Sequence, residues 1–270
     1  MASTNPLFLN TVLLRGSVEE KIEAARKAGF DQIEMWREDV SGSAKSADAL
    51  KNVLQNSGVA LTDYQVLLDF DGASVSRSSK RDEAVQMMHV ARELGADTIL
   101  VPANTSAQCD SNLVVDDLAW LADEARKYRL KIAYEAMAWS TFINTLPKAW
   151  DIIQKVNRDN LGLVVDAFHI FSLGRTVADL QDIPVERIFL VQLSDFTGLP
   201  DLKNIVETAR HSRLLPGEGD FPLTDLVDTL LSRRYAGPIG LEVFNDHLKS
   251  QQADKVADNA MRALKALLTK

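Results

Sequence analysis

The stretch Leu94-Gly95-Ala96-Asp97-Thr98-Ile99-Leu100-Val101 runs from the end of a helical pattern, through a glycine, into a short apolar run. The same succession occurs at Ala28-Gly29-Phe30, before residues 32–35, and at Ser57-Gly58, before residues 59–62. Glycine readily adopts the left-handed conformation that ends a helix. Each stretch therefore predicts a helix followed by a buried strand.

Eight apolar runs recur along the chain, and helical periodicity fills the intervals between them. The predicted strands are residues 7–12, 32–35, 59–62, 98–101, 130–134, 161–165, 188–191 and 239–241, and the predicted helices include residues 18–26, 80–92, 113–128, 146–156 and 223–233. Ser17 and Glu20 predict a capping box at the start of the first helix. Alternating strands and helices form parallel sheets, and eight units of about 34 residues match an α/β fold of the (β/α)8 TIM barrel type. We expect one domain over residues 1–270 with a C-terminal helix. An open doubly wound sheet is the alternative, although no Gly-x-Gly-x-x-Gly motif follows the first strand.

The composition restricts the possible partners. The chain carries 38 acidic and 30 basic side chains, for a net charge of −8. A nucleic-acid binder needs a basic surface, so a nucleic-acid partner is not expected.

The single Cys109 and the lack of a structural zinc motif fit a reducing cytoplasm. The N-terminal Met1-Ala2-Ser3-Thr4-Asn5 lacks the cationic region of a secretory signal, and no apolar run reaches about 18 residues, so no membrane association is expected. A monomer and a homo-oligomer both remain open.

Oxygen-bearing side chains end the last four predicted strands, at Glu135, Asp166, Gln192 and Glu242. In a barrel these ends converge on the C-terminal face, where active sites lie. Three carboxylates close together repel one another unless a cation neutralises them. Oxygen ligands suit Mg²⁺ or Mn²⁺ better than zinc, so the four side chains predict a divalent metal site. For any one of them, the alternative is a polar residue that only marks where its strand leaves the core.

Further candidates surround this predicted metal site. His169, three residues after Asp166, and Glu135 are the candidate catalytic residues, His169 because a histidine moves protons near neutral pH. Glu34, at the end of the second strand, is expected to line the same mouth of the barrel. The candidate substrate-binding residues follow strands three to five or lie in the loop before the last strand: Gln65, Asn104, Trp139, His211 and Arg213.

The chain resembles the xylose isomerase-like TIM-barrel superfamily of sugar isomerases, epimerases and related enzymes. The resemblance covers nearly the whole chain and rests on Tyr134-Glu135, Asp166-Ala167-Phe168-His169, Gln192, Leu241-Glu242 and Pro216-Gly217-Glu218-Gly219. It implies a divalent metal, Mg²⁺, Mn²⁺ or Co²⁺, held by Glu135, Asp166, Gln192 and Glu242 at the ends of strands five to eight.

Within this superfamily, residues 132–139, 182–184, 191–195 and 210–213 look most like bacterial 3-dehydroshikimate dehydratases. Residues 157–166 also resemble inosose isomerases, which more often carry His at the place of Gln192. The dehydratases show an Arg before an Asp-Phe pair after strand three, whereas this chain has Leu68 before Asp69-Phe70. Arg213 is therefore the expected partner of a substrate carboxylate.

The resemblance implies an enzyme that removes a proton next to the carbonyl of a small polyhydroxylated substrate. Loss of a β-hydroxyl then gives a dehydratase, here one that converts 3-dehydroshikimate to protocatechuate. Return of the proton at another carbon or face gives a sugar or inosose isomerase or epimerase, which is the alternative. A barrel that only binds a sugar is a further class. A DNA-repair barrel of the endonuclease IV type is disfavoured by the acidic charge and by the presence of only four histidines.

Overall fold

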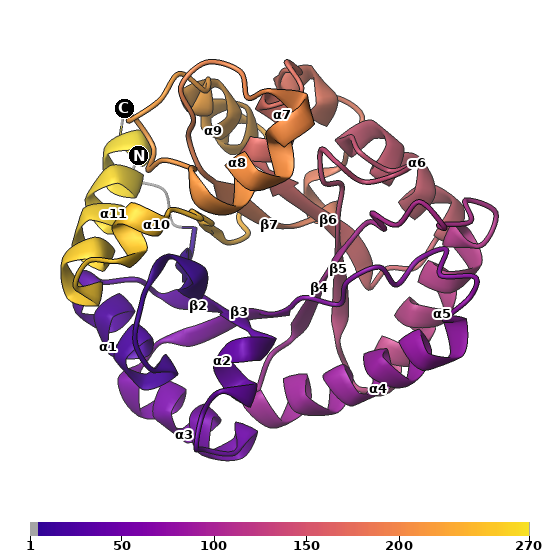
Figure 1. Cartoon of the computed structure of the whole chain (residues 1–270), viewed down its shortest axis with the longest axis horizontal. Coiled ribbons are helices and arrows are strands. Elements are labelled where there is room, and N and C mark those ends of the chain that lie inside the picture. Colours follow the sequence, from indigo (N-terminus) through magenta and orange to yellow (C-terminus); the bar gives the residue numbers. More distant parts are fainter. Residues whose placement is uncertain (1–4, 270) are drawn as a thin grey trace.

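The computed structural model describes residues 5–269, and it confirms a closed barrel of parallel strands in the order β1 to β8, in which β8 pairs with β1. Figure 1 shows this ring of strands with the helices outside it. The strands are β1 Leu7–Asn10, β2 Gln32–Trp36, β3 Ala60–Gln65, β4 Thr98–Pro102, β5 Lys131–Glu135, β6 Leu161–Asp166, β7 Ile188–Leu193 and β8 Ile239–Leu241. The N-terminal segment used above to argue against a secretory signal lies, up to residue 4, outside the described residues.

The helices cover the outside of the barrel and part of its C-terminal face. They are α1 Val18–Ala28, α2 Arg37–Ser41, α3 Ala47–Ser57, α4 Arg77–Leu94, α5 Val114–Lys127, α6 Leu146–Val156, α7 Ala167–Phe171, α8 Ile205–His211, α9 Leu223–Ser232, α10 Asp246–Lys249 and α11 Ala253–Leu268. The predicted C-terminal helix is α11, which lies beside α1 and covers the seam between the two ends of the chain (Figure 1). Within residues 5–269, no helix has the length and apolar character needed to cross a membrane.

Local capping explains where several elements begin and end. Gly29, Gly58 and Gly95 each have a positive φ and end α1, α3 and α4, as predicted. Ser17 and Glu20 form the predicted capping box. The predicted extension of the first strand to Val12 is wrong, because the Asn10 side chain accepts a hydrogen bond from Val12 N and starts a 3₁₀ helix.

The inside of the barrel is filled by a small apolar cluster of Phe8, Val66, Leu100, Ala133, Val164 and Leu190. Phe8 explains a glycine in β8, since a Cβ on Gly240 would lie 2.3 Å from both the Phe8 ring and its carbonyl oxygen. The larger apolar core lies between the strands and the helices. Polar side chains occupy the C-terminal end of the barrel, where the register sets Asp166 opposite Gln192.

Candidate functional site

The four predicted metal ligands meet in one buried cluster at the C-terminal end of the barrel. Glu135 and Asp166 are the last residues of their strands, as predicted. The prediction is off by one residue for the other two, since Leu193 follows Gln192 within β7 and Glu242 comes directly after β8. All four side chains are buried. Possible ligand atoms of Glu135, Asp166 and His169 lie within 4.8 Å of one another.

Asp166 also positions His169. Its carboxylate accepts a hydrogen bond of 2.6 Å from Phe168 N and so caps the short helix α7, which carries His169. His169 Nε2 then lies 3.4 Å from Glu135 Oε1 and 3.6 Å from Asp166 Oδ2. Ala138 N donates to Nδ1 at 3.2 Å. This backbone donor favours the neutral ring with its hydrogen on Nε2, directed toward the carboxylates.

Arg213 lies inside the cluster rather than at its edge. Its Nη1 donates to Asp166 Oδ2 at 2.9 Å and to Glu242 Oε2 at 3.2 Å, and its Nε donates to Ala209 O. Burial opposes the charge of the guanidinium, but Asp166 and Glu242 outweigh it and raise the pKa of Arg213. Arg213 therefore aligns two of the predicted ligands.

The pKa of Glu242 indicates that Arg213 does not neutralise all the negative charge of the cluster. Burial raises the pKa of Glu242 well above its ordinary value, and Arg213 offsets this only in part, because Glu135, Asp166 and Asp63 add further negative charge. A divalent cation among these groups would stabilise their ionised forms.

A second pair of carboxyl groups, Glu34 and Asp63, lies deeper in the barrel. Burial, together with the charges of Asp63 and Glu242, raises the pKa of Glu34 well above its ordinary value. Burial also raises the pKa of Asp63 to about 8, although its hydrogen bond with Glu34 acts in the opposite direction. Asn10 Nδ2 and Gln192 Nε2 donate hydrogen bonds to the Glu34 carboxyl group. Asp63 was not among the residues predicted from the sequence, although its spacing of two from Gln65 places both side chains on one face of β3.

A cavity of about 60 Å³ adjoins the cluster. Its walls are largely apolar, and Trp139 contacts His169 edge-to-face at a centroid distance of 4.9 Å. Leu68, which offers no charge to a substrate, also lines the cavity. Arg210, which the sequence analysis did not select, also lines it, and it makes no ion pair with any residue from 5 to 269.

The other three predicted substrate-binding residues do not line this cavity. Gln65 is fully buried, and neither amide atom has a hydrogen-bond partner within the described chain. His211 is partly exposed on α8 and pairs with Asp246 at 2.9 Å. The buried Asn104 donates to Asp71 O and accepts from Ser106 N, so its amide stabilises the loops around it.

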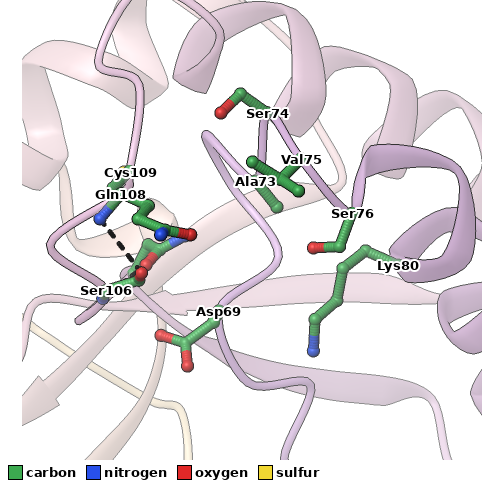
Figure 2. A pocket seen from close by; sticks show the side chains of 10 residues that line it. Asp69, Ala73, Ser74, Val75, Ser76, Lys80, Ser106, Gln108 and Cys109 are labelled. Atoms are coloured by element: carbon green, nitrogen blue, oxygen red, sulfur yellow. Dashed lines mark hydrogen bonds between the residues drawn. The ribbon is translucent and has the colours of Figure 1, made fainter.

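Asn104 instead borders a second cavity, of about 240 Å³, between the loops that follow β3 and β4. Figure 2 shows Asp69 and Lys80 at this cavity. Lys80 Nζ donates to Leu68 O and to Glu83, while Asp69 accepts from Thr105. The two charged side chains at this second cavity thus already have hydrogen-bond partners within the protein, whereas the carboxylate cluster keeps oxygens without partners.

Comparison with known proteins agrees with this architecture. The model of the xylose isomerase-like TIM barrel family matches residues 22–267. The chain belongs to this family. It is 35% identical over 257 residues to a 3-dehydroshikimate dehydratase of Pseudomonas putida, an alignment that covers 94% of this chain and 40% of that protein. An inosose isomerase of Halalkalibacterium halodurans is 25% identical over 92% of this chain and 91% of its own length.

Among solved structures of this family, a xylose isomerase-like TIM barrel/4-hydroxyphenylpyruvate dioxygenase fusion protein superposes with a TM-score of 0.91 at 33% identity. The match covers 96% of this chain and 42% of that one. The chain thus spans about two fifths of the dehydratase and of the fusion protein, and nearly all of the inosose isomerase.

Proposed function

We propose that this protein is a divalent-metal-dependent lyase that dehydrates 3-dehydroshikimate to protocatechuate. The observation that carries the proposal is a pair of buried oxygens in the carboxylate cluster. Gln192 Oε1 and Glu135 Oε1 have no hydrogen-bond partner among residues 5–269. Buried polar atoms normally have partners, so two free oxygens beside two further carboxylates suit a cation. The similarity to the dehydratase of P. putida supports the substrate.

The residues that would hold the ion are Glu135, Asp166, Gln192 and Glu242. This set of three carboxylates and one amide oxygen is typical of Mg²⁺ or Mn²⁺, and Co²⁺ is a further candidate. When bound, such an ion supplies a Lewis acid that polarises a substrate carbonyl and stabilises the negative charge formed as the α-proton leaves.

Two side chains are placed to move protons. Glu135 has two carboxylate oxygens: Oε1, which has no partner among the described residues, is available to the ion, and we assign the other oxygen as the acceptor of the α-proton. His169 Nε2 carries the ring hydrogen and lies beside Glu135 and Asp166, because its other nitrogen accepts from the backbone. We assign it as the hydrogen-bond donor to the departing hydroxyl, which leaves as water with the proton that Glu135 removed. Loss of water leaves a cyclohexadienone, and transfer of one proton from its remaining CH₂ group to the carbonyl oxygen gives the aromatic product, so substrate minus one water balances and both side chains return to their initial states.

The cavity fits a flat, carboxylated ring better than an open-chain sugar. Trp139, Met137 and Phe244 supply apolar surface to its walls, and Arg210 and Arg213 supply positive charge. A buried carboxylate requires such a fixed cation to replace its lost hydration. We keep the proposal that Gln65, Asn104 and His211 bind substrate, which requires their loops or side chains to move toward the cavity.

An isomerase or epimerase acting on an inosose or another keto-sugar is the second candidate. It is favoured by the similarity to an inosose isomerase over 91% of that protein's length. The same enolisation residues would serve both reactions.

An assay of the purified chain separates the two candidates. The protein is loaded in turn with Mg²⁺, Mn²⁺ or Co²⁺ and incubated with 3-dehydroshikimate, inosose and a panel of ketoses. The products are separated by chromatography and identified by mass spectrometry. We expect loss of one water from 3-dehydroshikimate, and its abolition by a chelator. Isomerisation of inosose or a ketose without any dehydration of 3-dehydroshikimate would contradict the proposal.

A further inference from the structure

The amide nitrogen of Gln192 lies against two carboxyl groups, and its amide oxygen has no hydrogen-bond partner among the described residues. Its Nε2 lies 2.9 and 3.2 Å from the two oxygens of Glu34 and 3.3 Å from Glu242 Oε1. All three side chains are buried. Nε2 therefore donates toward carboxylates, while Oε1 has no partner in the described part of the chain.

Only one orientation of this amide is compatible with its neighbours. An exchange of its nitrogen and oxygen would place a carbonyl oxygen against the oxygens of Glu34 and Glu242, and the hydrogen bonds that these oxygens accept from Nε2 would be lost. The exchange would remove hydrogen bonds to charged groups, each worth about 1.5–3 kcal/mol. It would also put an NH₂ group, which cannot bind a cation, in the place of the unpartnered oxygen.

Hydrogen bonds from neighbouring side chains fix the position of the Glu34 carboxyl group. Asn10 Nδ2 donates to Glu34 Oε2 at 3.0 Å and to Glu242 Oε1 at 3.1 Å, so one amide connects the two carboxylates. Trp36 Nε1 in turn donates to Asn10 Oδ1 at 2.8 Å, which fixes the orientation of that amide. The hydrogen bonds thus form a chain from Trp36 through Asn10 and Glu34 to Gln192.

We infer that Glu34 is a positioning residue that orients the Gln192 amide, so that the carbonyl oxygen and not the NH₂ group faces the divalent cation. This inference rests on the metal site of the proposed function. Glu34 acts through Gln192, and a hydrogen-bond partner that fixes the orientation of a metal ligand typically changes metal affinity by about 10–100-fold when it is replaced.

The test is a double-mutant cycle on metal affinity, measured by titration calorimetry of Mn²⁺ into the metal-free full chain. In Glu34→Gln, the new amide can donate to Gln192 and favour the wrong orientation, so we expect Mn²⁺ binding about 10–100-fold weaker. In a Gln192→Glu background the ligand has two equivalent oxygens and needs no orientation. There, Glu34→Gln is expected to leave the affinity unchanged or to raise it, since the amide introduced at position 34 can donate to the carboxylate introduced at position 192.

Two variants separate this effect from charge and from folding. Glu34→Asp keeps the charge but withdraws the carboxylate by one methylene, so it should also weaken Mn²⁺ binding, whereas a purely electrostatic role predicts no change. Glu186→Gln makes the same chemical change at an exposed position outside the site and should bind Mn²⁺ like the wild type. Thermal unfolding of each metal-free variant shows whether it is folded, and Glu34→Asp replaces Glu34→Gln in the cycle if the latter is not.

The outcomes are distinct. Equal losses of affinity from Glu34→Gln in both backgrounds, or no loss in the wild-type background, would overturn the inference while the metal site stands. Wild-type protein that binds no Mn²⁺ would overturn the metal site of the proposed function, and the inference with it.

Discussion

Asp166 shows how one side chain serves the fold and the site together. It ends β6, caps α7 and accepts a hydrogen bond from Arg213. The position of His169 follows from this cap, because the helix begins one residue after Asp166. The pair could be predicted from its spacing in the sequence, since three residues are enough to fix it locally. The role of Arg213 could not, because its contacts join residues 29 and 47 positions apart.

His169 is the residue whose replacement tests proton transfer. His169→Asn should lower turnover of 3-dehydroshikimate by about a hundredfold or more, the usual contribution of a general acid or base. The metal content should stay unchanged, because Asp166 and Glu135 remain. Steady-state kinetics and elemental analysis of the same preparation check both points. Normal turnover would return His169 to a structural role.

Arg210 is expected to recognise the carboxylate of the ligand, since Leu68 supplies no charge and Arg213 is held by Asp166 and Glu242. We expect wild-type protein to bind 3,4-dihydroxybenzoate more tightly than catechol, which lacks the carboxylate. In Arg210→Ala this difference should shrink by about tenfold or more, the value of a charge-assisted hydrogen bond. Calorimetry measures both ligands, and Arg262→Ala, on the distant α11, is the control. An unchanged difference in Arg210→Ala would exclude the role.

Asp63 makes the stability of the metal-free protein depend on pH. Burial raises its pKa from 3.8 to about 8. Its contribution to the free energy of unfolding is therefore complete below its unfolded pKa and is lost as the pH rises through about 8. Asp63→Asn cannot ionise, so its stability relative to the wild type should increase steadily between about pH 5 and 8. Urea unfolding across this range checks the sign, and a difference that does not vary with pH would contradict it.

At the scale of elements, the long helices could be predicted from apolar periodicity and the strands from apolar runs after glycine. Residues 146–156 were predicted with the observed bounds of α6. The short helices α2, α7 and α10 have four or five residues, which is too few to show a period. The pairing of Glu34 with Asp63 was also beyond prediction, because β2 and β3 shift register within the pair.

The capping box of α1 gives a prediction at this scale. Ser17 Oγ accepts from Glu20 N, and Glu20 Oε2 accepts from Ser17 N. Ser17→Ala should cost about 1 kcal/mol and lower Tm by about 2–4 °C in a protein of this size. Ser17→Asp retains a capping oxygen and should lie close to the wild type in differential scanning calorimetry. Equal losses in both variants would show that the cap itself is not what stabilises α1.

For the whole molecule, the alternation of strands and helices was sufficient to predict the barrel, because eight such units close on themselves when each strand pairs with the next. Closure then explains why Glu135, Asp166, Gln192 and Glu242, far apart in sequence, meet in one cluster. The exact hydrogen-bond partners that orient them could not be predicted, since they come from β1, β2 and the loop between α8 and α9.

The most direct measurement is anomalous diffraction from crystals of the full chain grown with Mn²⁺. We predict one strong anomalous peak among the oxygens of Glu135, Asp166, Gln192 and Glu242, with Gln192 Oε1 rather than Nε2 toward the ion. A chain that crystallises with Mn²⁺ but shows no peak at this cluster, or shows its peak elsewhere, would contradict the metal site.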